Sequence, residues 1–158
     1  MASPTLNPDH DHNDPKDEKA YKALSLEERL ALALRQRLTD KERELILRRE
    51  QWMQVRVYFA RRADLRPHEI EFLLADQDHV IRLCMAKRDD LTPEQIARCV
   101  ADRDPNVRYF IARNARLPEG SRQQLLNDAD PLVRRAAAKG PRAARIEARR
   151  GQAALVRS

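Results

Sequence analysis

A segment of this chain repeats every 26 residues. The copies begin at Leu65, Leu91 and Leu117, and a proline follows each of these leucines by one or two positions. Each copy continues with an acidic turn and then with a hydrophobic residue followed by arginine, as in Val107-Arg108. Self-similarity at a period of a few tens of residues is typical of solenoids, whose units bury their apolar faces against neighbouring units. The repeat therefore limits the possible folds more than any other feature of the sequence.

Each copy of the repeat predicts a hairpin of two helices. Thr92 and Gln95 form a capping-box pattern around Pro93, which indicates the start of a first helix. The turn ends with an aspartate before a proline, as in Asp104-Pro105, and this pair indicates the start of a second helix. In both helices the apolar residues follow the spacing of one buried stripe. We therefore expect an all-α fold, a short right-handed α-solenoid of about four helical-hairpin repeats.

The register of the repeat also predicts the domain organisation. Residues 1–22 are acidic and poor in apolar side chains, which is typical of a disordered tail. Residues 23–150 are expected to form the helical-repeat domain, and residues 151–158 a basic C-terminal tail. Within the domain we expect capping helices over residues 25–37 and 143–150, and repeats near residues 38–64, 65–90, 91–116 and 117–142. The first repeat is irregular, because it has one extra residue and carries Glu50 in place of the turn aspartate.

Two rows of cations recur in the second helices. On a helical wheel the first row lies on the apolar arc, so its arginines need partners, because an unpaired buried charge is costly. The expected partner is the turn aspartate six residues earlier, which would join the two helices of one hairpin or neighbouring units. The predicted structural ties are Asp76, Arg82, Asp102, Arg108, Asp128 and Arg134. If Arg108 is buried against Asp102, replacing that aspartate with alanine should cost about 3 to 5 kcal/mol. Phosphate binding by the same arginines is the alternative.

The second row of cations lies on the opposite side of the wheel, and nothing in the repeat pairs with it. Stacked units would turn it into a continuous basic stripe, which is either a solvated face or a binding surface. Tyr109 and Arg135 fall on the same outward side, where apolar and basic side chains mix as they do in protein interfaces. The predicted partner-binding residues are Arg61, Lys87, Arg113, Lys139, Tyr109 and Arg135.

The segment from Leu117 to Lys139 reads Leu-Pro, then Leu-Leu-x-Asp-x-Asp-Pro-x-Val-Arg, then alanine and lysine. This pattern resembles the variant leucine-rich repeat of bacteria. It is also similar to HEAT repeats, whose units carry an acidic residue and an arginine at a similar offset. The resemblance covers residues 65–139 well and residues 39–62 more loosely. It implies an all-helical superhelix that serves as a scaffold, but it does not imply one activity, because such repeats occur in unrelated settings.

The sequence offers no motif for catalysis, and we predict neither an enzyme nor a cofactor. Glycine-rich phosphate loops, nucleophile motifs and metal-ligand spacings are missing from it, and the histidines of Asp9-His10-Asp11-His12 lack a rigid scaffold. Cys84 and Cys99 fall at core positions and are expected to be reduced core thiols. No apolar run is long enough to span a membrane and no secretion signal is evident, so a cytoplasmic protein without a membrane partner is expected.

Charge leaves two classes of partner open. The net charge is +6, and from Pro131 onward eight lysines and arginines face a single acid, Glu147. Our leading hypothesis is a non-enzymatic interaction module that binds an acidic protein through the basic stripe. The alternative is a nucleic-acid-binding protein that uses the stripe together with the C-terminal arginines. Trp52 either anchors an interface or fills the gap that the extra residue leaves.

Overall fold

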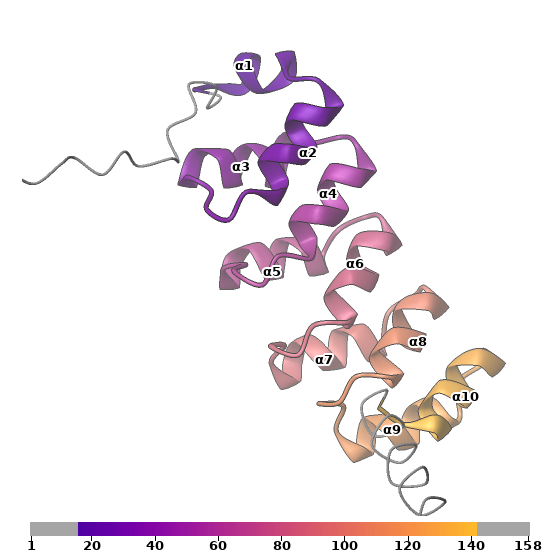
Figure 1. Cartoon of the computed structure of the whole chain (residues 1–158). Helices are drawn as coiled ribbons and strands as arrows, with labels where there is room; N and C mark the ends of the chain where they lie inside the picture. Colours follow the sequence, from indigo (N-terminus) through magenta and orange to yellow (C-terminus); the bar gives the residue numbers. More distant parts are fainter. Residues whose placement is uncertain (1–15, 142–158) are drawn as a thin grey trace, which may run out of the picture. The chain divides into compact units, whose positions relative to one another are not determined.

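The computed structural model describes residues 16–141, and every regular element within that range is an α-helix (Figure 1). The helices are α1 (Glu18–Ala23), α2 (Leu26–Leu34), α3 (Asp40–Arg49), α4 (Met53–Ala60), α5 (Pro67–Leu74), α6 (His79–Ala86), α7 (Pro93–Val100), α8 (Pro105–Ala112), α9 (Glu119–Leu126) and α10 (Pro131–Lys139). The all-α part of the prediction is thereby confirmed. The described residues fall into two compact units, of which the first ends at Phe59 and the second begins at Ala60.

In the first unit, side chains cap the starts of the first three helices. Asp17 accepts a hydrogen bond from the backbone N–H of Ala20 at 2.8 Å, which starts α1. Ser25 and Thr39 each form a capping box with the glutamate three residues further on, and these boxes start α2 and α3. Helix α1 packs on α3. The helix predicted over residues 25–37 is present, but it is shorter at its C-terminal end.

Helix α1 corrects the predicted N-terminal tail. Tyr21 is 0% exposed, and its hydroxyl donates a hydrogen bond to Glu50. Burial, together with the neighbouring carboxylate, raises the pKa of Tyr21 well above its usual value. One buried aromatic side chain thus orders a segment whose charged composition indicates disorder. The tail predicted over residues 1–22 is therefore too long, and its first 15 residues lie outside the described part.

A buried carboxylate, that of Glu50, joins segments of the first unit. It accepts hydrogen bonds from the backbone N–H groups of Gln51 and Trp52 at 2.7 and 2.8 Å. It also accepts one from Nη1 of Arg29 at 3.3 Å. The Arg29 guanidinium lies 4.3 Å from the Trp52 ring centroid and 4.8 Å from that of Tyr21. Cation–π contacts therefore hold the only tryptophan against this cluster, although 38% of its surface stays exposed.

The second unit contains three pairs of helices at one spacing. The first helices α5, α7 and α9 begin at residues 67, 93 and 119, and the second helices α6, α8 and α10 begin at residues 79, 105 and 131. Within each pair the two helices pack together, and α8 packs on both α6 and α10 (Figure 1). These starts agree with the 26-residue register of the sequence.

Each second helix begins with an aspartate N-cap and packs through buried apolar side chains. Asp78, Asp104 and Asp130 each accept a hydrogen bond from the backbone N–H two residues further on, at 2.7 to 2.9 Å. The third and seventh positions of these helices are almost fully buried: Ile81, Met85, Val107, Ile111, Val133 and Ala137. Burying each of the large apolar side chains contributes about 1.5–3 kcal/mol. Helix α10 ends at Lys139, and the C-cap residue Gly140 has a positive φ of 68°, which suits glycine. The helix predicted over residues 143–150 and the tail 151–158 lie outside the described residues.

Candidate interaction surface

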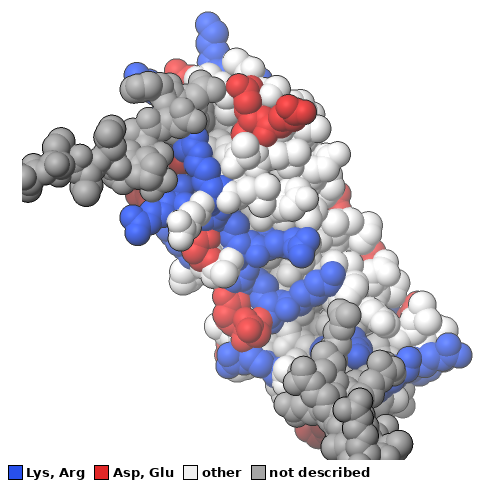
Figure 2. All heavy atoms as spheres, viewed as in Figure 1, with Lys and Arg blue, Asp and Glu red and all other residues white. Residues whose placement is uncertain are grey.

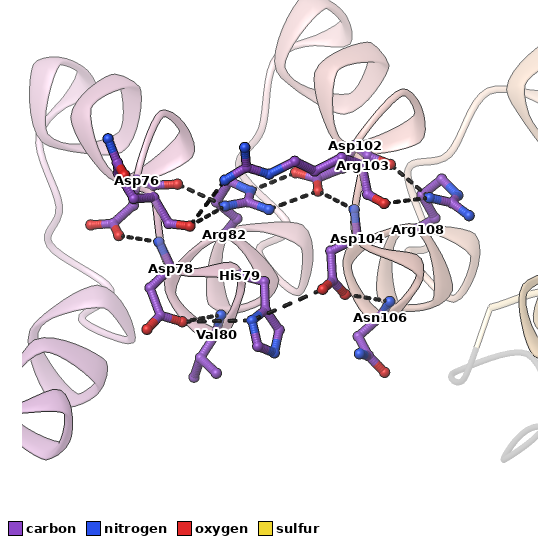
Figure 3. A network of polar contacts seen from close by, with 11 residues as sticks. Asp76, Asp78, His79, Val80, Arg82, Asp102, Arg103, Asp104, Asn106 and Arg108 are labelled. Atoms are coloured by element: carbon purple, nitrogen blue, oxygen red, sulfur yellow. Dashed lines mark hydrogen bonds and ion pairs between the residues drawn. The ribbon is translucent and has the colours of Figure 1, made fainter.

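Arg82 in α6 is bound on both sides of its guanidinium group (Figure 3). Nη1 donates to the backbone carbonyls of Asp76 and Gln77 in the preceding turn, at 2.8 and 3.0 Å. Nε and Nη2 donate to the two carboxylate oxygens of Asp102 in the next turn, at 2.7 and 3.0 Å. The side chains of Arg82 and Asp102 are only 8% and 10% exposed. One arginine therefore links two successive hairpins through a bidentate ion pair.

Arg108 in α8 repeats this arrangement one hairpin later. Its Nη1 donates to the Asp102 carbonyl at 2.8 Å, and its Nε and Nη2 donate to Asp128 at 2.7 and 3.0 Å. The expected pairing of Arg108 with the Asp102 carboxylate is therefore wrong. Because Arg108 follows Asp102 by only six residues, its guanidinium group reaches the backbone carbonyls of the turn before its own helix. Its carboxylate partner is Asp128, 20 residues further along the chain. The sequence left open whether the aspartate–arginine pairs join the two helices of one hairpin or two neighbouring hairpins. The carboxylate bonds join neighbouring hairpins.

Backbone N–H groups fix the orientation of the paired carboxylates. Oδ1 of Asp102 accepts a hydrogen bond from the N–H of Asp104, and Oδ1 of Asp128 accepts one from Asp130, both at 2.8 Å. Burial alone would raise the pKa of Asp102, but the bonds from Arg82 and the backbone outweigh it and hold that pKa below its usual range. The pKa of Asp128 is also lowered, mainly by Arg108.

The C-terminal end of this series differs from its middle. Oδ1 of Asp76 accepts a bond from the backbone N–H of Asp78 at 2.8 Å, as its equivalents do. At the other end, Nη1 of Arg134 donates to the carbonyls of Asp128 and Ala129. No carboxylate among residues 16–141 forms an ion pair with the Arg134 guanidinium. Among the described residues, Arg134, predicted to be a structural tie, thus makes only the carbonyl half of the contacts that Arg82 and Arg108 make.

The outward cations lie at the C-terminal ends of the second helices. Lys87 and Arg113 are the C-cap residues of α6 and α8, Lys139 is the last residue of α10, and Arg61 follows the end of α4. A cation in this position interacts favourably with the carbonyl end of a helix. Nζ of Lys87 also lies 4.0 Å from the Phe110 ring centroid in the next hairpin. The expectation that nothing pairs with this row is therefore wrong for Lys87.

Arg113 is the most enclosed member of that row. Its side chain is half-buried, and Nη1 is buried without a hydrogen-bond partner among residues 16–141. A buried donor without an acceptor is unfavourable, and an incoming acceptor would relieve it. Tyr109, one turn earlier in α8, is half-buried and makes an edge-to-face contact with Phe110 at a centroid distance of 5.2 Å. Arg135, its equivalent in α10, is exposed.

Helices α6, α8 and α10 contain neither aspartate nor glutamate. Their outward residues are apolar, such as the half-buried Leu83 and the 58% exposed Leu132, uncharged and polar, such as the exposed Asn106, or basic. Between residues 60 and 141 the acids lie instead in the turns and in the first helices. In the space-filling view, acidic side chains form a few separate clusters among Lys, Arg and uncharged groups (Figure 2). We call the outward side of α6, α8 and α10 the acid-free face.

A second row of ties between hairpins is not evident from the helical wheel. Nη1 of Arg88 donates to the carbonyl of Arg62 at 2.7 Å, 26 residues earlier. Nδ2 of Asn114, at the equivalent position of the next hairpin, donates to the carbonyls of Arg88 and Ala86 at 2.7 and 3.0 Å. In the sequence, these ties could have been found from an Arg-x-Asp pattern that recurs directly after the outward cations Arg61 and Lys87. Its two copies are Arg62-Ala63-Asp64 and Arg88-Asp89-Asp90.

Among residues 16–141, the cysteine and histidine side chains, which could act as nucleophiles or metal ligands, do not form a common site. Cys84 and Cys99 are buried and free, as predicted, and burial raises the pKa of both thiols. Nδ1 of His79 lies 3.8 and 3.9 Å from carboxylate oxygens of Asp78 and Asp104, which are already engaged as helix caps (Figure 3). Within residues 16–141, no group of three His, Cys, Asp or Glu side chains is arranged to hold a metal ion.

Comparison with protein-family models, curated proteins and solved structures gives no match for this chain. The variant-repeat and HEAT-like resemblance therefore stays a prediction from the sequence. None of the helices in the described range combines the length and the apolar character that crossing a bilayer requires.

Proposed function

We propose that this protein is a non-enzymatic helical-repeat scaffold that binds an acidic protein segment through its acid-free face. The observation that carries the proposal is the distribution of charge. Three successive packed helices present only apolar, uncharged and basic groups, whereas acids occur on the other elements of the same unit. A surface that carries charge of one sign attracts partners of the opposite sign and repels others.

The architecture proposed for the scaffold is a short right-handed α-solenoid. The equal spacing of the helix starts in the second unit and the matching bond lengths around Arg82 and Arg108 support regular stacking there. Residues 38–64 belong to the series as a fourth, irregular repeat on the basis of their sequence register. In such a stack, equivalent side chains lie one unit apart and form rows.

Two properties of the acid-free face favour a protein over a nucleic acid. First, its exposed and half-exposed apolar groups, such as Leu132 and Leu83, suit the side chains of an amphipathic segment. Second, Lys87 already contacts the ring of Phe110, so fewer cations of the acid-free face are available for phosphates. Nη1 of Arg113, which has no hydrogen-bond partner among residues 16–141, supplies a buried donor for a carboxylate, which gives specificity as well as attraction.

Site-directed photo-crosslinking in the source cells tests this face. A photo-crosslinking amino acid replaces Tyr109 on the face, and in a control variant it replaces Ala97, which is exposed on the first helix α7. We expect Tyr109 to yield protein adducts whose crosslinked peptides are rich in Asp and Glu, and Ala97 to yield none of them. Equal adducts from both positions, or adducts that nuclease removes, would refute the proposal.

Charge reversal provides the matching loss-of-binding experiment. Lys87→Glu with Lys139→Glu should abolish the Tyr109 adducts, whereas Lys19→Glu with Lys41→Glu, exposed in the first unit, changes the net charge equally and should keep them. In parallel, a 20-base-pair duplex is titrated at about 50 and 200 mM salt. Binding that weakens with a log–log slope near −0.9 per neutralised phosphate, and is lost in the first double variant, would favour nucleic acid instead.

A further inference from the structure

Backbone carbonyls hold one edge of the Arg134 guanidinium group, and the other edge has no ion-pair partner among residues 16–141. Its Nη1 donates to two carbonyls of its own turn, at 2.6 Å to Asp128 and at 3.0 Å to Ala129. Arg82 and Arg108 make the same pair of bonds with Nη1. In these two arginines the remaining edge, Nε and Nη2, binds a carboxylate, but Arg134 is exposed and makes no such ion pair within residues 16–141.

The two filled copies of the site define its occupant. In both, Nε and Nη2 bind one oxygen each of an aspartate, and that aspartate is the first residue of an Asp-x-Asp turn. The carboxylate also accepts the N–H of the second aspartate of the turn. The bound form is therefore an oriented side-chain carboxylate within a turn, and an arginine fork recognises this arrangement better than an ammonium group does.

The chain does not continue the series in its own register. The spacing that separates Asp102 from Asp128 leads next to Ala154, which has no carboxylate. After Pro131 the only acidic residue of the sequence is Glu147, which follows isoleucine and precedes alanine and is not part of an Asp-x-Asp turn. Among residues 16–141 no carboxylate fills this edge of Arg134, which leaves it available to a carboxylate of another molecule.

We propose that Arg134 is a docking site for an aspartate of an acidic partner segment that contains an Asp-x-Asp turn. This site does not rest on the acid-free face, because its contacts are at the N-terminal turn of α10, whereas Lys139 is at the other end of that helix. The pairs at Arg82 and Arg108 supply the geometry, and the charge of the open guanidinium edge supplies the attraction.

A capped peptide Asp-Ala-Asp-Pro-Leu-Val, which copies residues 128–133, is the probe. It is titrated into the full-length protein while nuclear magnetic resonance follows the Nε–H signals of the arginines. We expect the Arg134 signal to shift in a saturable manner, while the signals of Arg82 and Arg108 stay fixed because their edges are occupied. Arg135, the exposed neighbour that has no hydrogen bond from its guanidinium group among residues 16–141, serves as the control and should not shift.

Two variants sharpen the test. A peptide with asparagine in place of its first aspartate, and an Arg134→Lys protein, should each weaken binding about tenfold, because each removes the bidentate ionic pair. Equal shifts of Arg134 and Arg135, or equal binding of the asparagine peptide, would overturn the proposal. It would also be overturned if the Arg134 signal of the free protein resembled that of Arg82 and lost this position in a Glu147→Gln variant, since the chain would then fill its own site.

Discussion

Replacing Asp102 with alanine removes the carboxylate that holds Arg82 and tests whether this pair bears on stability. Arg82 would keep its two bonds to turn carbonyls, but its Nε and Nη2 would face no acceptor. Leaving a buried cation without its counter-ion costs about 3–5 kcal/mol. The freed N–H of Asp104 adds about 1 kcal/mol. The retained carbonyl bonds and the residual 8% exposure of the Arg82 side chain offset part of this sum, so we expect a loss of about 3 kcal/mol.

The assay is urea unfolding followed by circular dichroism at 222 nm. Asp102→Asn keeps an acceptor for the N–H of Asp104 and should cost less, about 2 kcal/mol. Asp89→Ala, which removes an exposed aspartate of the same unit, is the matched control and should cost about 0.5 kcal/mol or less.

A second substitution separates the loss of a contact from the burial of an unpaired charge. Adding Arg82→Met to Asp102→Ala replaces the stranded cation with an apolar side chain of similar length. The double variant should be more stable than Asp102→Ala alone by about 1–2 kcal/mol. The reasoning is refuted if Asp102→Ala costs less than about 1 kcal/mol, or if removing the arginine recovers no stability.

Three other predictions follow from buried or paired groups. Because the pKa values of Asp102 and Asp128 are lowered from their ordinary 3.8, the stability that they contribute is fully present above that value, and the free energy of unfolding should fall as the pH drops through the folded-state values in an acid titration. A double variant with Asn at both positions should flatten this dependence. Burial raises the pKa of Cys99 to about 12, so its thiol should react with a disulfide reagent at pH 8 only as fast as the protein unfolds, whereas fast labelling in native buffer would contradict its burial. Asn114→Ala removes three hydrogen bonds and leaves a buried carbonyl of Ala86 without its donor, so urea unfolding should show a loss of about 2–4 kcal/mol, and a loss below about 1 kcal/mol would mean that water replaces the amide.

Local signals in the sequence were sufficient to locate the helices of the second unit. The capping box of Thr92 and Gln95 and the Asp-Pro pairs act within a few residues of chain, so their effect is readable without tertiary structure. The same holds for the buried stripe, since residues such as Val107 and Ile111 follow the helical period. These signals do not depend on how one hairpin packs on another.

Contacts between hairpins could not be read in the same way. The wheel shows that Arg108 faces inward, but it does not specify whether the aspartate six residues before or 20 residues after supplies the carboxylate. The contact of Lys87 with Phe110 depends on the rise from one hairpin to the next, which the sequence does not contain. Helix α1 was missed because a single buried side chain, Tyr21, outweighs the charged composition around it.

The pairing of each arginine with an aspartate 20 residues later has a consequence for how the chain can change in length. Removing residues 91–116 as a block would bring Arg82 into the same relation with Asp128 that it now has with Asp102, with the preceding and following turns unchanged in type. Between Arg82 and Asp102, or between Arg108 and Asp128, an insertion or deletion whose length is not a multiple of 26 residues would change this spacing and misplace a buried ion. Gain and loss of whole hairpins is thus the route by which this unit can grow or shrink while keeping its charges paired.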